Sequence, residues 1–210
     1  KSMGYPEVRV LPIVLDLDHY QGNGTSARLN ELQPAGTTLL FVGRCAPNKA
    51  IHDLIRLFAY YHRHINPDSR FIYVGASDGL TGYYTMMKAQ ARQLGLDAFH
   101  FAGAVSNEEL FSAYRSADVF VCVSEHEGFC IPLLEAMTFG LPVLACAAGA
   151  IPETLDGSGV LIHERRWESV AELLGRLDQD YTLRDAIVAG QNQRLARYRS
   201  TNLKSRLRDV

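Results

Sequence analysis

Short apolar runs rich in β-branched and aromatic residues alternate along the chain with longer stretches in which apolar residues recur every three or four positions. The short runs are typical of strands covered on both faces, and the longer stretches are typical of amphipathic helices. Strands are predicted at 39–42, 71–74, 100–101, 119–123, 142–145 and 160–162. Helices are predicted at about 49–65, 83–94, 106–116, 132–140, 166–177 and 182–198. This alternation predicts an α/β fold, a doubly wound parallel sheet of the Rossmann-like kind.

The loops that follow the predicted strands contain glycine or other small residues. They are expected at 43–48, 75–82, 103–105, 124–131 and 146–151. In doubly wound sheets, ligands bind at the carboxyl ends of the strands, near the point where the strand order reverses. We therefore expect a binding site made from these loops.

The segment 125–145 combines an anion-binding pattern with two carboxylates. Gly128 permits close approach of the backbone to a ligand, and Pro132 begins a helix whose free amides and dipole favour an anion. Glu127 and Glu135 flank this point and could accept hydrogen bonds from sugar hydroxyls. Together these features indicate a nucleotide-sugar site. The alternative is that the glutamate spacing is due to chance and that a helix-starting glutamate only caps the helix.

The segment 41–50 places Gly43, Arg44 and Lys49 just after a predicted strand. Arg44 could contact two phosphate oxygens and Lys49 could add a point charge. The segment is not a Walker A loop, because Asn48 stands where the second glycine is required, and no GxGxxG follows any predicted strand. The alternative is two solvated surface cations.

Composition excludes several classes of protein. The chain has 210 residues, 47% of them hydrophobic, and a formal net charge of −2, which argues against disorder and against a nucleic-acid-binding surface. The longest apolar runs are too short to cross a bilayer, so no transmembrane segment is expected.

The cysteines are scattered without a CxxC pair, and the histidines are dispersed, so no metal site is expected. The pattern suits buried free thiols in a reducing cytoplasm. The four cysteines are Cys45, Cys122, Cys130 and Cys146.

From about Thr38 to Tyr198, the sequence resembles the C-terminal half of family 4 glycosyltransferases of the GT-B fold. The resemblance is carried by VGRCAPNK, by FAGAVSNEELFSAYRSADVFVCVSEHEGFCIPLLEAMTFGLPVLA and by AGAIPETLDGSGVLI. It implies that residues 1–20 are a connection from an N-terminal domain missing from this chain. Residues 21–210 would then form a Rossmann-like donor-binding domain with C-terminal helices.

The resemblance also implies roles for individual residues. Arg44 and Lys49 would hold the donor diphosphate, and Glu127 would lie beside the transferred sugar; these three are the expected catalytic residues. Glu135 would bind the ribose hydroxyls. The expected main-chain positions are Gly43 in the cationic loop, Ala104 and Val105 near the base, and Gly128, Phe129, Cys130 and Ile131 around the sugar and distal phosphate.

Three positions depart from the family pattern. Ala50 replaces the usual glycine and Val123 a frequent proline, and both changes are expected to affect packing alone. Cys130 replaces a frequent glycine, which would place a thiol against the donor-sugar pocket.

The implied activity is retaining hexosyl transfer from a GDP- or UDP-linked sugar to a glycan or lipid-linked acceptor, in polysaccharide or lipopolysaccharide synthesis. No cofactor and no metal are expected, since fixed cations and a helix N-terminus could stabilise the leaving diphosphate. The fragment alone is expected to bind the donor without transferring it, in the cytoplasm or at the inner membrane face through the missing half. The alternatives are a nucleotide-sugar epimerase and a non-catalytic nucleotide-binding module.

Overall fold

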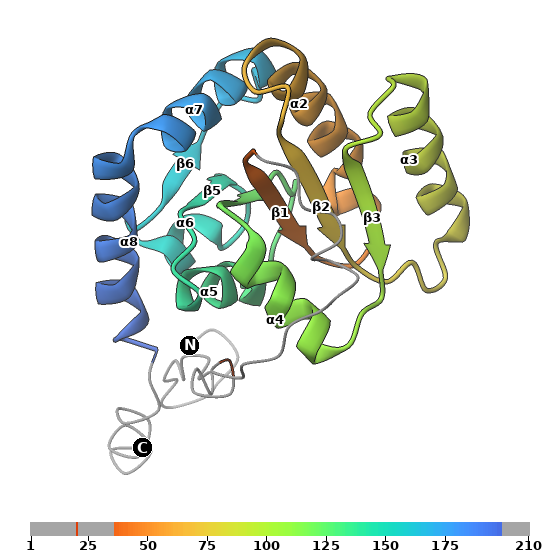
Figure 1. The fold of residues 1–210 in the computed structure, drawn as a ribbon. Helices are drawn as coiled ribbons and strands as arrows, with labels where there is room; N and C mark the ends of the chain where they lie inside the picture. The colour runs from red at the N-terminus through yellow and green to blue at the C-terminus, as the bar shows by residue number, and fades with distance from the viewer. Residues whose placement is uncertain (1–19, 21–35, 199–210) are drawn as a thin grey trace, which may run out of the picture.

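A computed structural model describes Tyr20 and residues 36–198. The predicted boundary between residues 20 and 21 and the expected connection at residues 1–19 lie outside the described residues. Six parallel strands form one sheet in the order β3-β2-β1-β4-β5-β6 (Figure 1). The strands are β1 (Thr38–Val42), β2 (Arg70–Val74), β3 (Phe99–Gly103), β4 (Val119–Cys122), β5 (Val143–Cys146) and β6 (Val160–Ile162).

The strand order reverses beside β1. The chain builds β2 and β3 outward on one side of β1 and then returns to place β4 on its other side. β1 pairs with β2 along its whole length, from Thr38 opposite Arg70 to Val42 opposite Val74. The loops after β1 and β4 therefore leave neighbouring strands at the same edge of the sheet, which is where ligands bind in such folds.

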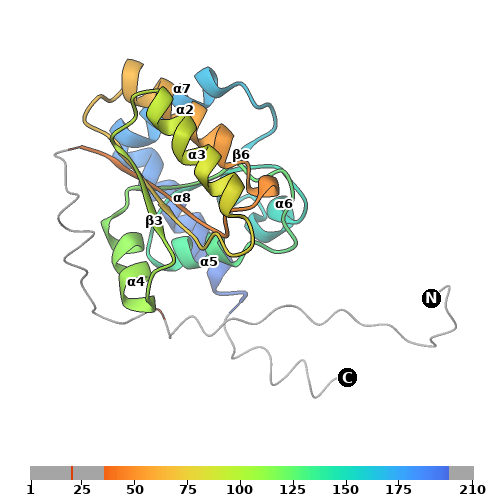
Figure 2. The same cartoon turned by 90° about the vertical axis from the view of Figure 1, so that its right-hand side faces the viewer.

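Helices cover both faces of the sheet, as Figures 1 and 2 show. On one face, α2 packs between α3 and α7; on the other lie α4 and α5, and α8 packs on α5. Both faces of the central strands are buried, so their nearly continuous apolar sequence is explained. The helices are α2 (Ile51–His64), α3 (Thr81–Gln93), α4 (Asn107–Ser116), α5 (Ile131–Thr138), α6 (Ile151–Leu155), α7 (Trp167–Gln179) and α8 (Tyr181–Leu195).

The predicted elements are confirmed with small shifts at their ends. Residues Pro47–Lys49 form a separate 3-10 turn, η2, ahead of α2 rather than the start of that helix. Val123 follows β4 instead of ending it. The five-residue helix α6 is missing from the prediction, because so short a segment shows too few turns for helical periodicity to be recognised.

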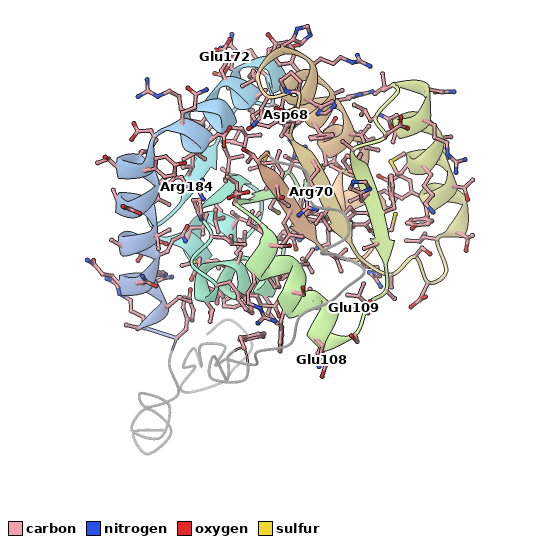
Figure 3. The ribbon with its side chains drawn as sticks, in the orientation of Figure 1. Asp68, Arg70, Glu108, Glu109, Glu172 and Arg184 are labelled. Carbon is pink, nitrogen blue, oxygen red and sulfur yellow. The ribbon has the colours of Figure 1, made fainter. Side chains whose placement is uncertain are left out.

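The start of α4 is a capping box. The amide of Glu109 donates to Ser106 Oγ at 3.2 Å, and the amide of Ser106 donates to Glu109 Oε2 at 2.9 Å. Figure 3 shows Glu108 and Glu109 at this end of the helix, where their charge complements the helix dipole.

Replacing Ser106 with alanine is therefore expected to lower the free energy of unfolding by about 1 kcal/mol. Ser106→Gly should cost only a few tenths of a kcal/mol, because glycine is itself an acceptable N-cap residue. Urea denaturation of the two variants and the unmodified chain measures the difference. Equal stability of both variants would contradict a capping role.

Candidate functional site

Three loops at the carboxyl edge of the sheet are joined by main-chain hydrogen bonds. The amide of Glu125, after β4, donates to the carbonyl of Asn48, after β1, at 2.8 Å. The amide of Ala150, after β5, donates to the carbonyl of Glu127 at 3.0 Å. The side chain of Asn48 also donates to the carbonyl of His126 at 3.3 Å. The two segments singled out from sequence thus meet at one place.

Lys49 and Glu127 form an ion pair at this meeting point. Lys49 Nζ lies 2.7 Å from each carboxylate oxygen of Glu127. The Glu127 side chain is only 6% exposed and that of Lys49 20%, so neither charge is fully solvated. Ala50 turns the chain between η2 and α2 with φ of +50°, in the left-handed region. Glycine adopts this conformation readily, which explains the glycine that the family pattern has here.

Arg44 stands exposed just beyond β1, on the same loop as Lys49. It forms no ion pair with any other described residue. The loop is anchored to the end of β2 by the amide of Gly43, which donates to the carbonyl of Val74 at 2.9 Å. The guanidinium is therefore carried by an anchored backbone and remains accessible to a ligand.

The loop that leads into α5 presents main-chain groups beside this pair. Cys130 is the N-cap residue, with φ of +62°, and Pro132 follows in the first turn. Thr154 Oγ1 donates to the carbonyl of Phe129 at 2.8 Å, which anchors the loop to α6. Gly128 and Ile131 are exposed. The first amides of a helix have no partners within the helix, so this end favours an anion.

Glu135 lies one turn into α5 and is held by two tyrosines. It accepts hydrogen bonds from Tyr114 at 2.7 Å and from Tyr20 at 3.0 Å. Burial and the neighbouring carboxylate raise the pKa of Tyr114 well above its ordinary value, so this hydroxyl stays a donor. Each carboxylate oxygen can accept more than one hydrogen bond, so capacity for a further donor remains.

Ala104 and Val105 lie just after β3, at the far side of β2 from the ion pair but on the same sheet edge. Ala104 is exposed and Val105 is half-buried. The structure therefore brings Lys49, Glu127 and the α5 loop into direct contact, and places Arg44, Ala104 and Val105 along the rim that they share.

A second ion-pair network supports the loop that leads into α5. The sequence analysis does not predict it. Asp53, which is buried in α2, pairs with Arg165, which follows β6, at 3.3 Å. Arg165 also donates to the carbonyl of Ser124 at 2.9 Å, at the start of the α5 loop. No local pattern joins residues so far apart in the chain, so sequence periodicity could not reveal this network.

Cys122 and Cys130 form a buried pair beside Glu127, which was also not foreseen. The neighbouring Cys122 thiol, together with burial, raises the pKa of Cys130 far above its ordinary value, and the nearby Cys130 lowers the pKa of Cys122. The two sulfur atoms and a Glu127 carboxylate oxygen all lie within 4.8 Å of one another. All four cysteines are buried and free, as the sequence predicts, but their spacing in the chain does not show that two of them lie together.

Within the described part of the chain, every helix is too short or too polar to cross a membrane.

The family model for group 1 glycosyl transferases matches residues 28–194. A D-inositol 3-phosphate glycosyltransferase of Corynebacterium jeikeium is 32% identical over 190 residues, which are 86% of this chain and 45% of that protein. A GDP-mannose:cellobiosyl-diphosphopolyprenol alpha-mannosyltransferase of Xanthomonas campestris is 30% identical over 175 residues, 82% of this chain and 43% of that protein. The chain thus spans less than half the length of these relatives.

Solved structures show the same fold. The C-terminal domain of a group 1 family glycosyl transferase from Francisella tularensis superposes with a TM-score of 0.71 at 26% identity, over 89% of this chain and 99% of that one. HepE of Anabaena, in complex with UDP and glucose, gives a TM-score of 0.77 at 22% identity, over 93% of this chain and 54% of that one. The predicted doubly wound sheet, as half of a GT-B fold, is confirmed. The chain belongs to the group 1 glycosyl transferases.

Proposed function

We propose that this chain binds a GDP- or UDP-linked sugar at the edge formed by the loops after β1, β4 and β5, for retaining hexosyl transfer. The observation that carries the proposal is the Lys49–Glu127 ion pair beside the first turn of α5. The pair offers a cation that can bind a diphosphate and a carboxylate that can accept a hydrogen bond from a sugar hydroxyl. Arg44, exposed on the same loop, adds a second cation.

The division of roles follows from the charges. A diphosphate that binds at the α5 amides shares the Lys49 ammonium with Glu127, while Arg44 contacts phosphate oxygens from the open side. As the glycosidic bond breaks, negative charge grows on the diphosphate, and these fixed positive groups stabilise it. The transfer therefore proceeds without a divalent metal. Glu135 accepts hydrogen bonds from the ribose hydroxyls, and the main chain at Ala104 and Val105 contacts the base.

Two relatives support the choice of donor. HepE of Anabaena was solved with UDP and glucose, and the Xanthomonas relative is named for GDP-mannose. We propose a glycan or lipid-linked acceptor, supplied through an N-terminal domain, and a reaction in the cytoplasm or at the inner membrane face. Because this chain spans about half of its relatives, we expect it to bind the donor without transferring the sugar.

Nucleotide binding is the direct test. In a thermal-shift screen of UDP-, GDP- and ADP-sugars, one class should raise stability, by about 2.7 kcal/mol when the ligand is at a hundred times its Kd. The shift should persist in EDTA, because no metal is required. Arg44→Ala should weaken binding about tenfold, since a hydrogen bond to a charged group contributes about 1.5 kcal/mol.

Arg176→Ala is the matched control, because that cation is 74% exposed on α7 and pairs only with Asp180 among the described residues. No shift with any nucleotide sugar, or a shift that disappears in EDTA, would contradict the proposal. Incubation with the donor separates the alternatives: an epimerase would convert the sugar of the nucleotide-linked donor without an acceptor, as NMR would show. The relatives named as transferases do not favour that reading.

A further inference from the structure

Three potential metal ligands converge inside the α5 loop. Cys122 ends β4, Cys130 caps α5, and Glu127 lies between them in sequence. Their two sulfur atoms and a carboxylate oxygen lie within 4.8 Å of one another, and all three residues are buried. Among the described residues, no other group of three such side chains comes this close.

We propose that this cluster binds one thiophilic divalent cation, such as Zn²⁺ or Cd²⁺, and that the bound ion competes with the nucleotide. Two thiolates and one carboxylate are a ligand set that suits Zn²⁺, with water in the fourth position. Tetrahedral ligands at about 2.3 Å from the ion lie roughly 3.8 Å apart, so the cluster must contract by at most about 1 Å. The soft sulfur ligands select against Mg²⁺ and Mn²⁺, which prefer oxygen.

The charges in the cluster favour this occupant. When the ion binds, each thiol releases its proton to solvent. The two thiolates and the Glu127 carboxylate then balance the charges of the cation and of the Lys49 ammonium, which lies 2.7 Å from Glu127. A buried cluster without net charge avoids most of the cost of removing charge from water.

The ion would block the donor site because both need Glu127. A carboxylate oxygen that coordinates the metal can no longer accept a hydrogen bond from the donor sugar, while the other oxygen keeps its contact with Lys49. Only this competition rests on the proposed function; the metal site itself does not.

The metal site is tested without nucleotide. The chain, kept reduced by a phosphine that does not bind the metal, is titrated with Cd²⁺ while thiolate-to-cadmium absorption is recorded. One ion should bind per chain. Cys122→Ser and Cys130→Gly should each weaken binding by at least about tenfold, the least that even an outer-shell change usually costs. Glycine suits the φ of +62° at position 130, so that variant should fold.

Cys45→Ala is the control, because its thiol is buried elsewhere, against Tyr73, and its loss should leave Cd²⁺ binding unchanged. Cd²⁺ binding that is unaffected by both cluster variants would overturn the proposal, as would displacement of Cd²⁺ by equimolar Mg²⁺. In a second arm, bound Cd²⁺ should weaken binding of the UDP- or GDP-linked sugar at least tenfold in the unmodified chain and not in Cys130→Gly. Tight metal binding beside unchanged nucleotide affinity would overturn the competition, and failure of all nucleotides to bind would contradict the proposed function alone.

Discussion

Replacing Lys49 with alanine is expected to weaken nucleotide-diphosphate binding about a hundredfold. The substitution removes one cation from the diphosphate and leaves the Glu127 carboxylate, 6% exposed, without its partner and facing the incoming anion. The variant loses a hydrogen bond to a charged group and leaves a buried charge uncompensated. Together these cost about 3 kcal/mol of binding free energy, or two powers of ten in Kd. Calorimetric titration with UDP or GDP measures the change.

A double variant isolates the carboxylate's share of this effect. Lys49→Ala combined with Glu127→Gln should bind the nucleotide better than Lys49→Ala alone, because the repelling charge is gone while the amide can still accept a hydrogen bond. Urea denaturation of each variant separates lost affinity from lost stability. The proposed cationic role is refuted if Lys49→Ala binds within twofold of the unmodified chain. Equal affinities of the single and double variants would show that Glu127 does not face the diphosphate.

Gly149→Ala is expected to lower the free energy of unfolding by about 3 kcal/mol and to disturb the proposed donor site as well. A Cβ at this position would lie 2.2 Å from the carbonyl oxygen of Glu127 and 2.9 Å from its nitrogen, and φ is +55°. Overpacking costs about 1–3 kcal/mol, and the left-handed conformation adds about 1 kcal/mol for a residue with a side chain. Both contacts are with backbone, so the loop that carries Glu127 must move.

The matched control is Gly82→Ala, in the first turn of α3, where an added Cβ meets nothing within 4 Å. That variant should be as stable as the unmodified chain or more stable by up to about 1 kcal/mol, because alanine favours the helix. Denaturant midpoints and nucleotide affinity are measured for both. If Gly149→Ala matches Gly82→Ala in both respects, the close packing of the β5 loop on Glu127 is not what fixes the site.

The sheet and its main helices could be predicted because each strand is mostly apolar and each long helix spans several turns. The edge that carries the site followed from parallel geometry, since all six strands end on the same side. Lys49 and Glu127 are 78 positions apart, yet their contact was foreseeable once both were placed after neighbouring strands. Whether each site residue performs its expected role stays a prediction.

Contacts that depend on side-chain direction could not be predicted. Asp53 looks like an acidic residue in the first turn of a helix, and Arg165 like a surface cation after a strand. Their pairing depends on how α2 packs beside β6 and on the depth at which Asp53 is buried. The approach of Cys130 to Cys122 likewise depends on a left-handed residue at the start of α5, a conformation that sequence disfavours for cysteine.

Ala50 and Cys130 flank the Lys49–Glu127 pair. The backbone of both residues lies in the left-handed region, although both carry a side chain. Main-chain hydrogen bonds maintain these two turns: the amide of Ala50 donates to the carbonyl of Pro47, and the amide of Leu133 donates to the carbonyl of Cys130. The proposed donor site is therefore held by the protein's own hydrogen bonds before a ligand arrives, and we expect a nucleotide to bind without reorganisation of these loops. Association should then be limited by diffusion and electrostatic attraction, and differences in affinity among donors should arise mainly from how quickly each one leaves.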